Sequence, residues 1–119
     1  MKTTEKGNQG EDIAVDYLLK NGYTIEARNY NWGRLEIDII ASHQKAMVFI
    51  EVKLRGSKHY GAPWQAVNSG KQQRLIKAAH HYLNKVEWDG EARFDIISII
   101  GSNSGAEIQH IESAYYARV

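Results

Sequence analysis

The stretch that decides the fold runs from Leu35 to Lys53 and reads LEIDIIASHQKAMVFIEVK. Two apolar runs flank a short polar break at residues 42–45, and polar side chains interrupt both runs with a period close to two. This period is typical of strands, so the stretch predicts an antiparallel hairpin. The side chains expected to share one face are Leu35, Ile37, Ile39 and Ala41 in the first strand, and Val48, Ile50 and Val52 in the second.

A turn centred on Gln44-Lys45 would place Asp38 opposite Glu51, and Glu36 opposite Lys53. Directly opposed residues of an antiparallel pair have Cβ atoms about 4.5–5.5 Å apart. The pairing therefore gathers three carboxylates and one ammonium on one side of the hairpin. Opposed carboxylates destabilise a sheet, which a bound cation would relieve. An ordinary amphipathic hairpin with one solvated, charged face is the alternative at this point.

A divalent metal ion fits these residue types. Magnesium takes oxygen ligands, often one or two carboxylates together with waters and substrate phosphate. We therefore expect Asp38 and Glu51 to hold Mg²⁺ or Mn²⁺. Lys53, two residues after Glu51, would orient a water molecule or stabilise charge on a phosphate under attack.

The same residues carry a resemblance to a known family. Asp38, twelve intervening residues and Glu51-Val52-Lys53 resemble the D…ExK motif of the PD-(D/E)XK nucleases, which include restriction endonucleases and Holliday junction resolvases. The wider pattern resembles the small bacterial YraN-like family, whose members are described as predicted endonucleases. That pattern comprises Gly7, Gly10-Glu11, Ala14, Tyr17-Leu18, Gly22-Tyr23, Asn29, Glu36-Ile37-Asp38, Val48–Lys53, Arg55, Lys71, Ala79 and Arg93-Phe94-Asp95. Two positions depart from the pattern, because Ile37 replaces the proline of the superfamily and Leu35 the glycine of the family.

The resemblance implies a fold and a set of roles. The fold would be an α/β restriction-endonuclease-like core, with a mixed five-stranded sheet flanked by helices in the order αβββαββ. Asp38, Glu51 and the carbonyl of Val52 would hold the metal ion. Lys53 would position water, and Glu11 and Glu36 would support the site.

The remaining elements follow from periodicity and capping signals. We expect a polar, frayed segment at Met1–Lys6, a Pro63 that can open a helical turn, and a parallel strand pair within Met47–Ile100. The expected helices are Gly10–Asn21, capped by Gly22, and Ser69 to about Lys85, opened by a capping box from Ser69 to Gln72. The other expected strands are Tyr23–Asn29, Ala92–Ile100 and Ala106–Ile111, with a turn at Tyr30–Arg34.

Several charged residues have two interpretations. Glu11 falls on the buried stripe of the first helix, either as a first-turn glutamate favoured by the helix dipole or as an additional acid of the site. The loop Leu54–Ala62 carries Arg55 and Lys58 among aromatic residues and glycines, which suits contacts to phosphates and bases, although a solvated loop has the same composition. Lys71, at the start of the second helix, is a candidate phosphate ligand.

Composition limits the classes of protein. A chain of 119 residues is expected to form a single domain over residues 1–119. Without cysteine it has neither disulfides nor thiolate metal sites. It has no long apolar run and no signal peptide, so we expect a cytoplasmic protein. A formal net charge of +1 does not by itself indicate nucleic acid.

The leading hypothesis is a metal-dependent nuclease that hydrolyses phosphodiester bonds, with DNA as the expected partner and branched DNA in repair or recombination as one substrate. A homodimer would help a small domain to cut two strands. The alternative is a non-catalytic nucleic-acid-binding module that retains the nuclease fold. A third hypothesis is an interaction protein without a role on nucleic acid.

Overall fold

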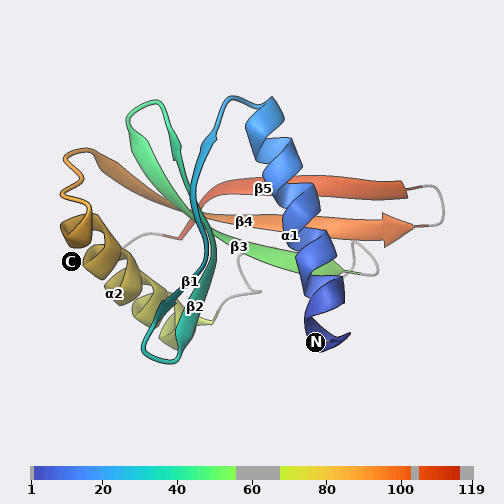
Figure 1. Ribbon diagram of the computed structural model, residues 1–119, viewed down its shortest axis with the longest axis horizontal. Helices are drawn as coiled ribbons and strands as arrows, with labels where there is room; N and C mark the ends of the chain where they lie inside the picture. Colours follow the sequence, from blue (N-terminus) through green and yellow to red (C-terminus); the bar gives the residue numbers. More distant parts are fainter. Residues whose placement is uncertain (1, 56–67, 103–104, 116–119) are drawn as a thin grey trace.

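The computed structural model describes residues 2–55, 68–102 and 105–115. Within these ranges, two helices and five strands follow one another in the order αβββαββ, as the sequence predicts (Figure 1). They are α1 (Lys2–Lys20), β1 (Thr24–Trp32), β2 (Leu35–His43), β3 (Ala46–Arg55), α2 (Ser69–Lys85), β4 (Glu91–Ser102) and β5 (Gly105–Tyr115).

The five strands form one mixed sheet in the order β1-β2-β3-β4-β5. The β3–β4 pair is parallel and the other three pairs are antiparallel, which confirms the expected parallel pair on either side of α2. Helix α1 packs on one face of the sheet and α2 on the other (Figure 1). This is the restriction-endonuclease-like α/β core that the sequence predicts.

Each helix contributes to a separate apolar core. On the α1 face, Ala14 and Leu18 are buried against sheet residues that include Ile39 and Val48. On the α2 face the core comprises Leu75, Ile76, Ala79 and Tyr82 of the helix, with Met47, Phe49, Phe94 and Ile96 of the sheet. Burying one such aliphatic or aromatic side chain is worth about 1.5–3 kcal/mol, so both faces of the sheet stabilise the fold.

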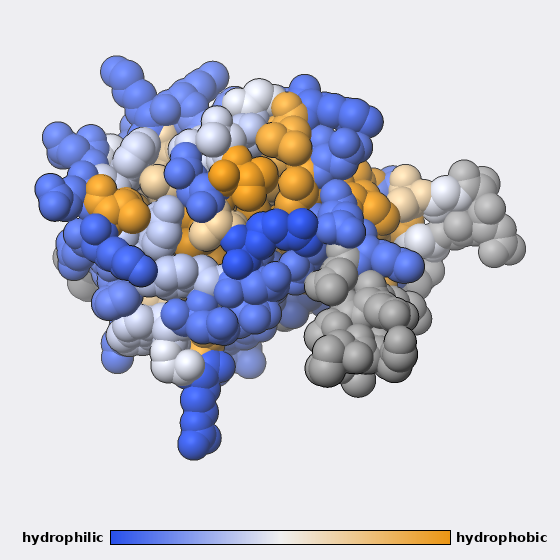
Figure 2. Space-filling model, in the orientation of Figure 1, coloured by the Kyte–Doolittle hydropathy of each residue, from blue (hydrophilic) through white to orange (hydrophobic). Residues whose placement is uncertain are grey.

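The outer surface on the α1 side is mostly hydrophilic, with apolar side chains in separate groups (Figure 2). This distribution fits helices that turn one apolar stripe to the sheet and leave charged residues in solvent. No helix among the described residues is long and apolar enough to cross a membrane.

Helix α1 ends where the sequence predicts but begins earlier. The N–H of Tyr23 bonds the carbonyl of Leu18 and the N–H of Gly22 bonds that of Leu19, which is the Schellman arrangement, with Gly22 at φ +85°. The expectation that the helix begins at Gly10 is wrong, because α1 starts at Lys2. The low helix propensity of glycine predicted a helix boundary at Gly10. The helix instead continues through Gly10, because the part that follows is packed on the sheet and extends the helix toward the N-terminus.

The other bounds differ from the predictions by a few residues. Strand β1 extends to Trp32, so the turn before β2 is only Gly33-Arg34. Helix α2 starts at Ser69, but its N-cap is Asn68, whose side chain accepts the N–H of Lys71, rather than the predicted Ser69. The termini of β4 and β5 also lie beyond the predicted ranges, because pairing between neighbouring strands continues after the apolar alternation ends.

The predicted β2–β3 register holds from His43 opposite Ala46 to Ile39 opposite Ile50, but the ladder ends there and does not include the predicted pairs Asp38–Glu51 and Glu36–Lys53. The single face expected for the apolar residues of β2 is wrong. Ile39 and Ala41 pack in the α1-side core, whereas Leu35 and Ile37 pack in the α2-side core. Strand β2 therefore changes sides near Asp38, where its pairing with β3 ends.

Candidate active site at the split between β2 and β3

Asp38 lies at the point where β2 separates from β3. Its Oδ2 accepts a hydrogen bond from the backbone N–H of Val52 at 2.8 Å, so a side chain replaces the ladder contact that ends here. On the other side of β2, Asn29 occupies the rung between the Arg28–Ile39 and Tyr30–Ile37 pairs. Asn29 has φ +52°, in the left-handed region where asparagine is enriched. The carboxylate of Asp38 thus lies between the N–H of Val52 on β3 and the carboxylates of Glu11 and Glu36.

Three carboxylates meet at this split. Oxygen atoms of Glu11, Glu36 and Asp38 all lie within 4.8 Å of one another. The side-chain amide of Asn29 donates to both oxygens of Glu11, at 3.0 and 3.2 Å, and approaches Glu36 at 3.5 Å. Arg28 lies 3.6 Å from Glu11, so one partly exposed cation and one amide face three acids.

Glu51 lies next to this cluster, on the α2 side of β3, and is only 7% exposed. Its Oε1 accepts a hydrogen bond from Lys71 Nζ at 3.1 Å, and Lys53 Nζ is 3.8 Å from the same oxygen. Its Oε2 is buried and has no hydrogen-bond partner among the described residues. A buried carboxylate oxygen without a partner is costly, which points to a ligand at this position.

The environment raises the pKa of Asp38 to about 7. Burial is the largest cause, and the negative charge of Glu51 is the next. The hydrogen bond from Val52 opposes the rise, while Glu11 and Glu36 add to it. The site therefore carries more negative charge than the chain satisfies, and a cation would relieve that excess.

Comparison with other proteins identifies the family. A model of the uncharacterised protein family UPF0102 matches residues 10–99. UPF0102 proteins of Christiangramia forsetii and Phocaeicola vulgatus are 40% identical over 112 residues, which is 94% of this chain and 94% and 93% of theirs. A UPF0102 protein of Porphyromonas gingivalis is 41% identical over 113 residues, covering 93% of this chain and 84% of its own length.

This chain belongs to the UPF0102 family. The match confirms the resemblance to the YraN-like proteins, a PD-(D/E)XK nuclease-like family. The matched range includes the acidic cluster, Glu51, Lys53 and Lys71.

The residues of this UPF0102 site fit a divalent metal ion. Carboxylate oxygens are the ligands that Mg²⁺ and Mn²⁺ prefer, and the three clustered acids already lie close together. The buried Oε2 of Glu51 adds an oxygen that no group of the described chain satisfies. Asp38, Glu11, Glu36 and Glu51 are thus the side chains that would hold the ion.

The positions of Glu36 and Lys53 can be compared with those expected from the hairpin register. Glu36 was expected opposite Lys53, but it pairs with Asn31 of β1 and its carboxylate joins Glu11 and Asp38. Lys53 lies beside Glu51 as expected. The prediction fails for Glu36 because β2 pairs with β3 only from Ile39 to His43, and Glu36 lies before this paired part.

The residues predicted to bind nucleic acid lie in different parts of the chain. Arg55 is the last residue of β3, which runs further than the loop predicted from Leu54 onward. Lys58 and Pro63 lie outside the described residues. Lys71 contacts Glu51 directly, so it belongs to the site itself as well as to the start of α2.

The acidic role of Glu11 is the interpretation that the geometry favours, since Glu11 is 8% exposed and lies with Asp38. Sequence reasoning missed Asn29 as a member of the site, although Asn29 appears in the family pattern. The sequence signal that could have identified it is a short polar residue inside a strand of alternating residues. Asparagine tolerates the left-handed backbone conformation found here, which places its amide between Glu11 and Glu36.

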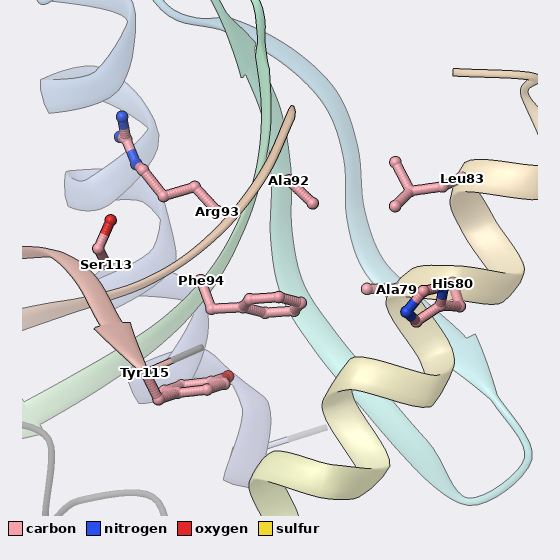
Figure 3. A pocket seen from close by; sticks show the side chains of 8 residues that line it. All are labelled: Ala79, His80, Leu83, Ala92, Arg93, Phe94, Ser113 and Tyr115. Atoms are coloured by element: carbon pink, nitrogen blue, oxygen red, sulfur yellow. The ribbon is translucent and has the colours of Figure 1, made fainter. Parts of the chain in front are cut away.

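A small apolar pocket lies elsewhere, between α2 and the β4–β5 end of the sheet. Its volume is about 200 Å³, and Ala79 and Leu83 approach the rings of Phe94 and Tyr115 there (Figure 3). None of the clustered acids lines it. We therefore place the candidate site at the β2–β3 split and not in this pocket.

Proposed function

We propose that this UPF0102 protein is a metal-dependent nuclease that hydrolyses phosphodiester bonds of nucleic acid. One observation carries the proposal: the cluster of Glu11, Glu36 and Asp38 adjoins a buried Glu51 oxygen without a partner, with Lys53 and Lys71 beside it. Acids with a structural role normally have all their oxygens paired with cations or hydrogen-bond donors. Here one buried oxygen of Glu51 is unpaired and suits a metal ion, while the two lysines beside Glu51 suit a phosphate.

Each residue of the site has a separate role in the proposed reaction. Mg²⁺ or Mn²⁺ held by the carboxylates would supply Lewis-acid activation of water and of the phosphate. Asn29 orients Glu11 by donating to both of its oxygens. Lys53 is partly buried and adjoins Glu51, so its ammonium is placed to stabilise charge that grows on the phosphate during attack. Lys71 neutralises Glu51 and offers a second ammonium to the substrate.

DNA is the expected nucleic acid, and branched DNA in repair or recombination is the first substrate to test. A homodimer would place two such sites on two strands. The alternative, a binding module that retains the fold without catalysis, makes the opposite prediction in the cleavage assay described next.

The test is cleavage of single-stranded, duplex and branched DNA and RNA with Mg²⁺ or Mn²⁺, at fixed salt because phosphate contacts depend on salt. Lys53→Ala should reduce the rate roughly 100- to 1,000-fold, the usual loss for one electrostatic contact in the transition state. Folding, metal binding and most nucleic-acid affinity should survive. Lys53→Arg should restore little activity, because a planar guanidinium does not replace a compact ammonium.

Lys45→Ala is the matched control, since Lys45 is an exposed lysine in the β2–β3 turn at the far end of the same hairpin. Equal cleavage by the wild type and Lys53→Ala would refute the proposed role of Lys53. A wild type that binds nucleic acid but cuts none of the panel would establish the binding module instead.

A further inference from the structure

A groove of about 480 Å³ lies between the β1–β2 turn and the first turns of α2. Figure 1 shows this turn beside the start of α2. Trp32, Gly33, Arg34 and Leu35 form one wall, and Lys71 and Arg74 form the other. Trp32, Arg34 and Arg74 are not members of the acidic cluster.

The groove concentrates positive charge on a chain whose net charge is only +1. Arg34 and Arg74 are exposed, and neither forms an ion pair with a carboxylate of the described residues. Lys71 is the third cation of the groove, and it donates to Glu51. Unpaired guanidinium groups facing one another across a groove indicate an anionic occupant, and guanidinium suits phosphate.

The aromatic side chain between these cations narrows the choice of anion. Trp32, the last residue of β1, is 36% exposed and lines the groove. The ring of His81 lies 5.9 Å from the indole, centroid to centroid, and part of the indole surface stays exposed. An indole beside cationic side chains can stack on a nucleobase, and a single strand offers the faces of its bases more freely than the interior of a duplex does.

We propose that this groove binds a single-stranded segment of nucleic acid, with Arg34 and Arg74 on its phosphates and Trp32 stacked on a base. Lys71 lines the groove and also contacts Glu51, so the segment would lead to Glu51, which lies next to the acidic cluster. The substrate class, a nucleic acid with a single-stranded end, flap or branch, rests on the proposed nuclease function. Binding in the groove does not depend on it.

The experiment measures the affinity of the full chain for three fluorescent probes in EDTA, so that no cleavage occurs. The probes are a ten-nucleotide oligothymidine, a blunt duplex of the same length and a polyglutamate peptide. Trp32→Ala should weaken oligothymidine binding roughly 5- to 100-fold, the range for loss of one stacked base, and should leave duplex binding unchanged. Trp32→Tyr should bind nearly as tightly as the wild type, since it keeps an aromatic face.

The arginines are tested through the dependence of affinity on salt. Arg34→Ala and Arg74→Ala should each weaken oligothymidine binding and reduce the salt slope by about 0.7, the value for one lost phosphate contact on a single strand. Arg34 lies in an exposed turn, so its variant tests the groove even if Trp32→Ala folds poorly. Lys77→Ala is the control, an exposed lysine one turn further along α2 and outside the groove.

Unchanged oligothymidine affinity in Trp32→Ala and Arg34→Ala would refute the proposal, as would equal binding of duplex or polyglutamate. The two proposals fail separately. Cleavage that persists while the groove variants bind normally removes the groove assignment alone. Absence of cleavage by the wild type, with weaker binding by the groove variants, removes the nuclease proposal alone.

Discussion

Burial and three neighbouring acids act together on Asp38. Because its pKa rises to about 7, the ionised form destabilises the metal-free protein at higher pH. Asp38→Asn removes the charge but keeps an oxygen that can accept the N–H of Val52. We predict that this variant is more stable than the wild type near pH 8 in EDTA by up to about 4 kcal/mol, since the rise from 3.8 to about 7 is about three pKa units of about 1.4 kcal/mol each.

Thermal melts with and without Mg²⁺ check this prediction and locate the ion. The wild type should melt at a higher temperature when Mg²⁺ is added, and Asp38→Asn should lose most of that rise. Asp16→Asn is the control, because Asp16 is an exposed aspartate paired with Lys20 on α1. An undiminished response to Mg²⁺ in Asp38→Asn would place the ion elsewhere.

The same carboxyl gives a pH dependence of known sign. The folded pKa of Asp38, about 7, lies above its ordinary value of 3.8, so between these values the folded chain keeps a proton that the unfolded chain has lost. The contribution of Asp38 to the free energy of unfolding therefore falls as pH rises through this window. Chemical unfolding in EDTA from about pH 4 to about pH 8 should show Asp38→Asn gaining stability relative to the wild type. A difference that stays constant with pH would contradict the cited pKa.

Among the elements, α2 places Lys71 in the site, and its first turn depends on Asn68. The side chain of Asn68 accepts the N–H of Lys71 at 2.9 Å, which satisfies one free donor of the helix terminus. Asn68→Ala should therefore lower the free energy of unfolding by about 1 kcal/mol. Asn68→Asp should keep the cap.

Urea unfolding measures this loss. Asn84→Ala is the control, since Asn84 is an exposed asparagine in the last turn of the same helix and alanine favours helix. If Asn68→Ala and Asn84→Ala were equally stable, the cap would not contribute as the geometry indicates.

At the scale of the whole molecule, Asp95 connects separate parts of the chain beneath α1. This fully buried carboxylate of β4 accepts hydrogen bonds from Arg93, from His110 of β5 at 2.7 Å and from the N–H of Ser113 at 3.0 Å. The other ring nitrogen of His110 lies 2.9 Å from the hydroxyl of Tyr17 on α1. Burial alone would raise the pKa of Asp95, but these hydrogen bonds outweigh it and lower the pKa.

Asp95→Ala should cost about 3–5 kcal/mol, because it leaves the partly buried Arg93 and His110 without their shared acceptor. Glu112→Gln should cost less than about 1 kcal/mol, since Glu112 is an exposed partner of the same arginine at 3.6 Å. Chemical unfolding of both variants measures the difference. A small loss in Asp95→Ala would show that the network does not hold α1 and β5 to the sheet.

The sequence by itself determined the elements and the hairpin register, because helical and strand periods, the Gly22 cap and the Gln44-Lys45 turn are local properties. It also singled out the D…ExK residues, whose charges interrupt runs that are otherwise buried. These signals depend on neighbours a few positions away, so they can be read along the chain.

Only the tertiary structure decided which acids meet. Glu11 reaches Asp38 from α1, and Lys71 reaches Glu51 from α2, over separations that no periodicity encodes. The change of sides in β2 moved Glu36 away from its predicted partner, since the ladder with β3 ends where Asp38 takes the N–H of Val52. The twist of the sheet and the packing of one helix on each face set these contacts, and both depend on all the strands together.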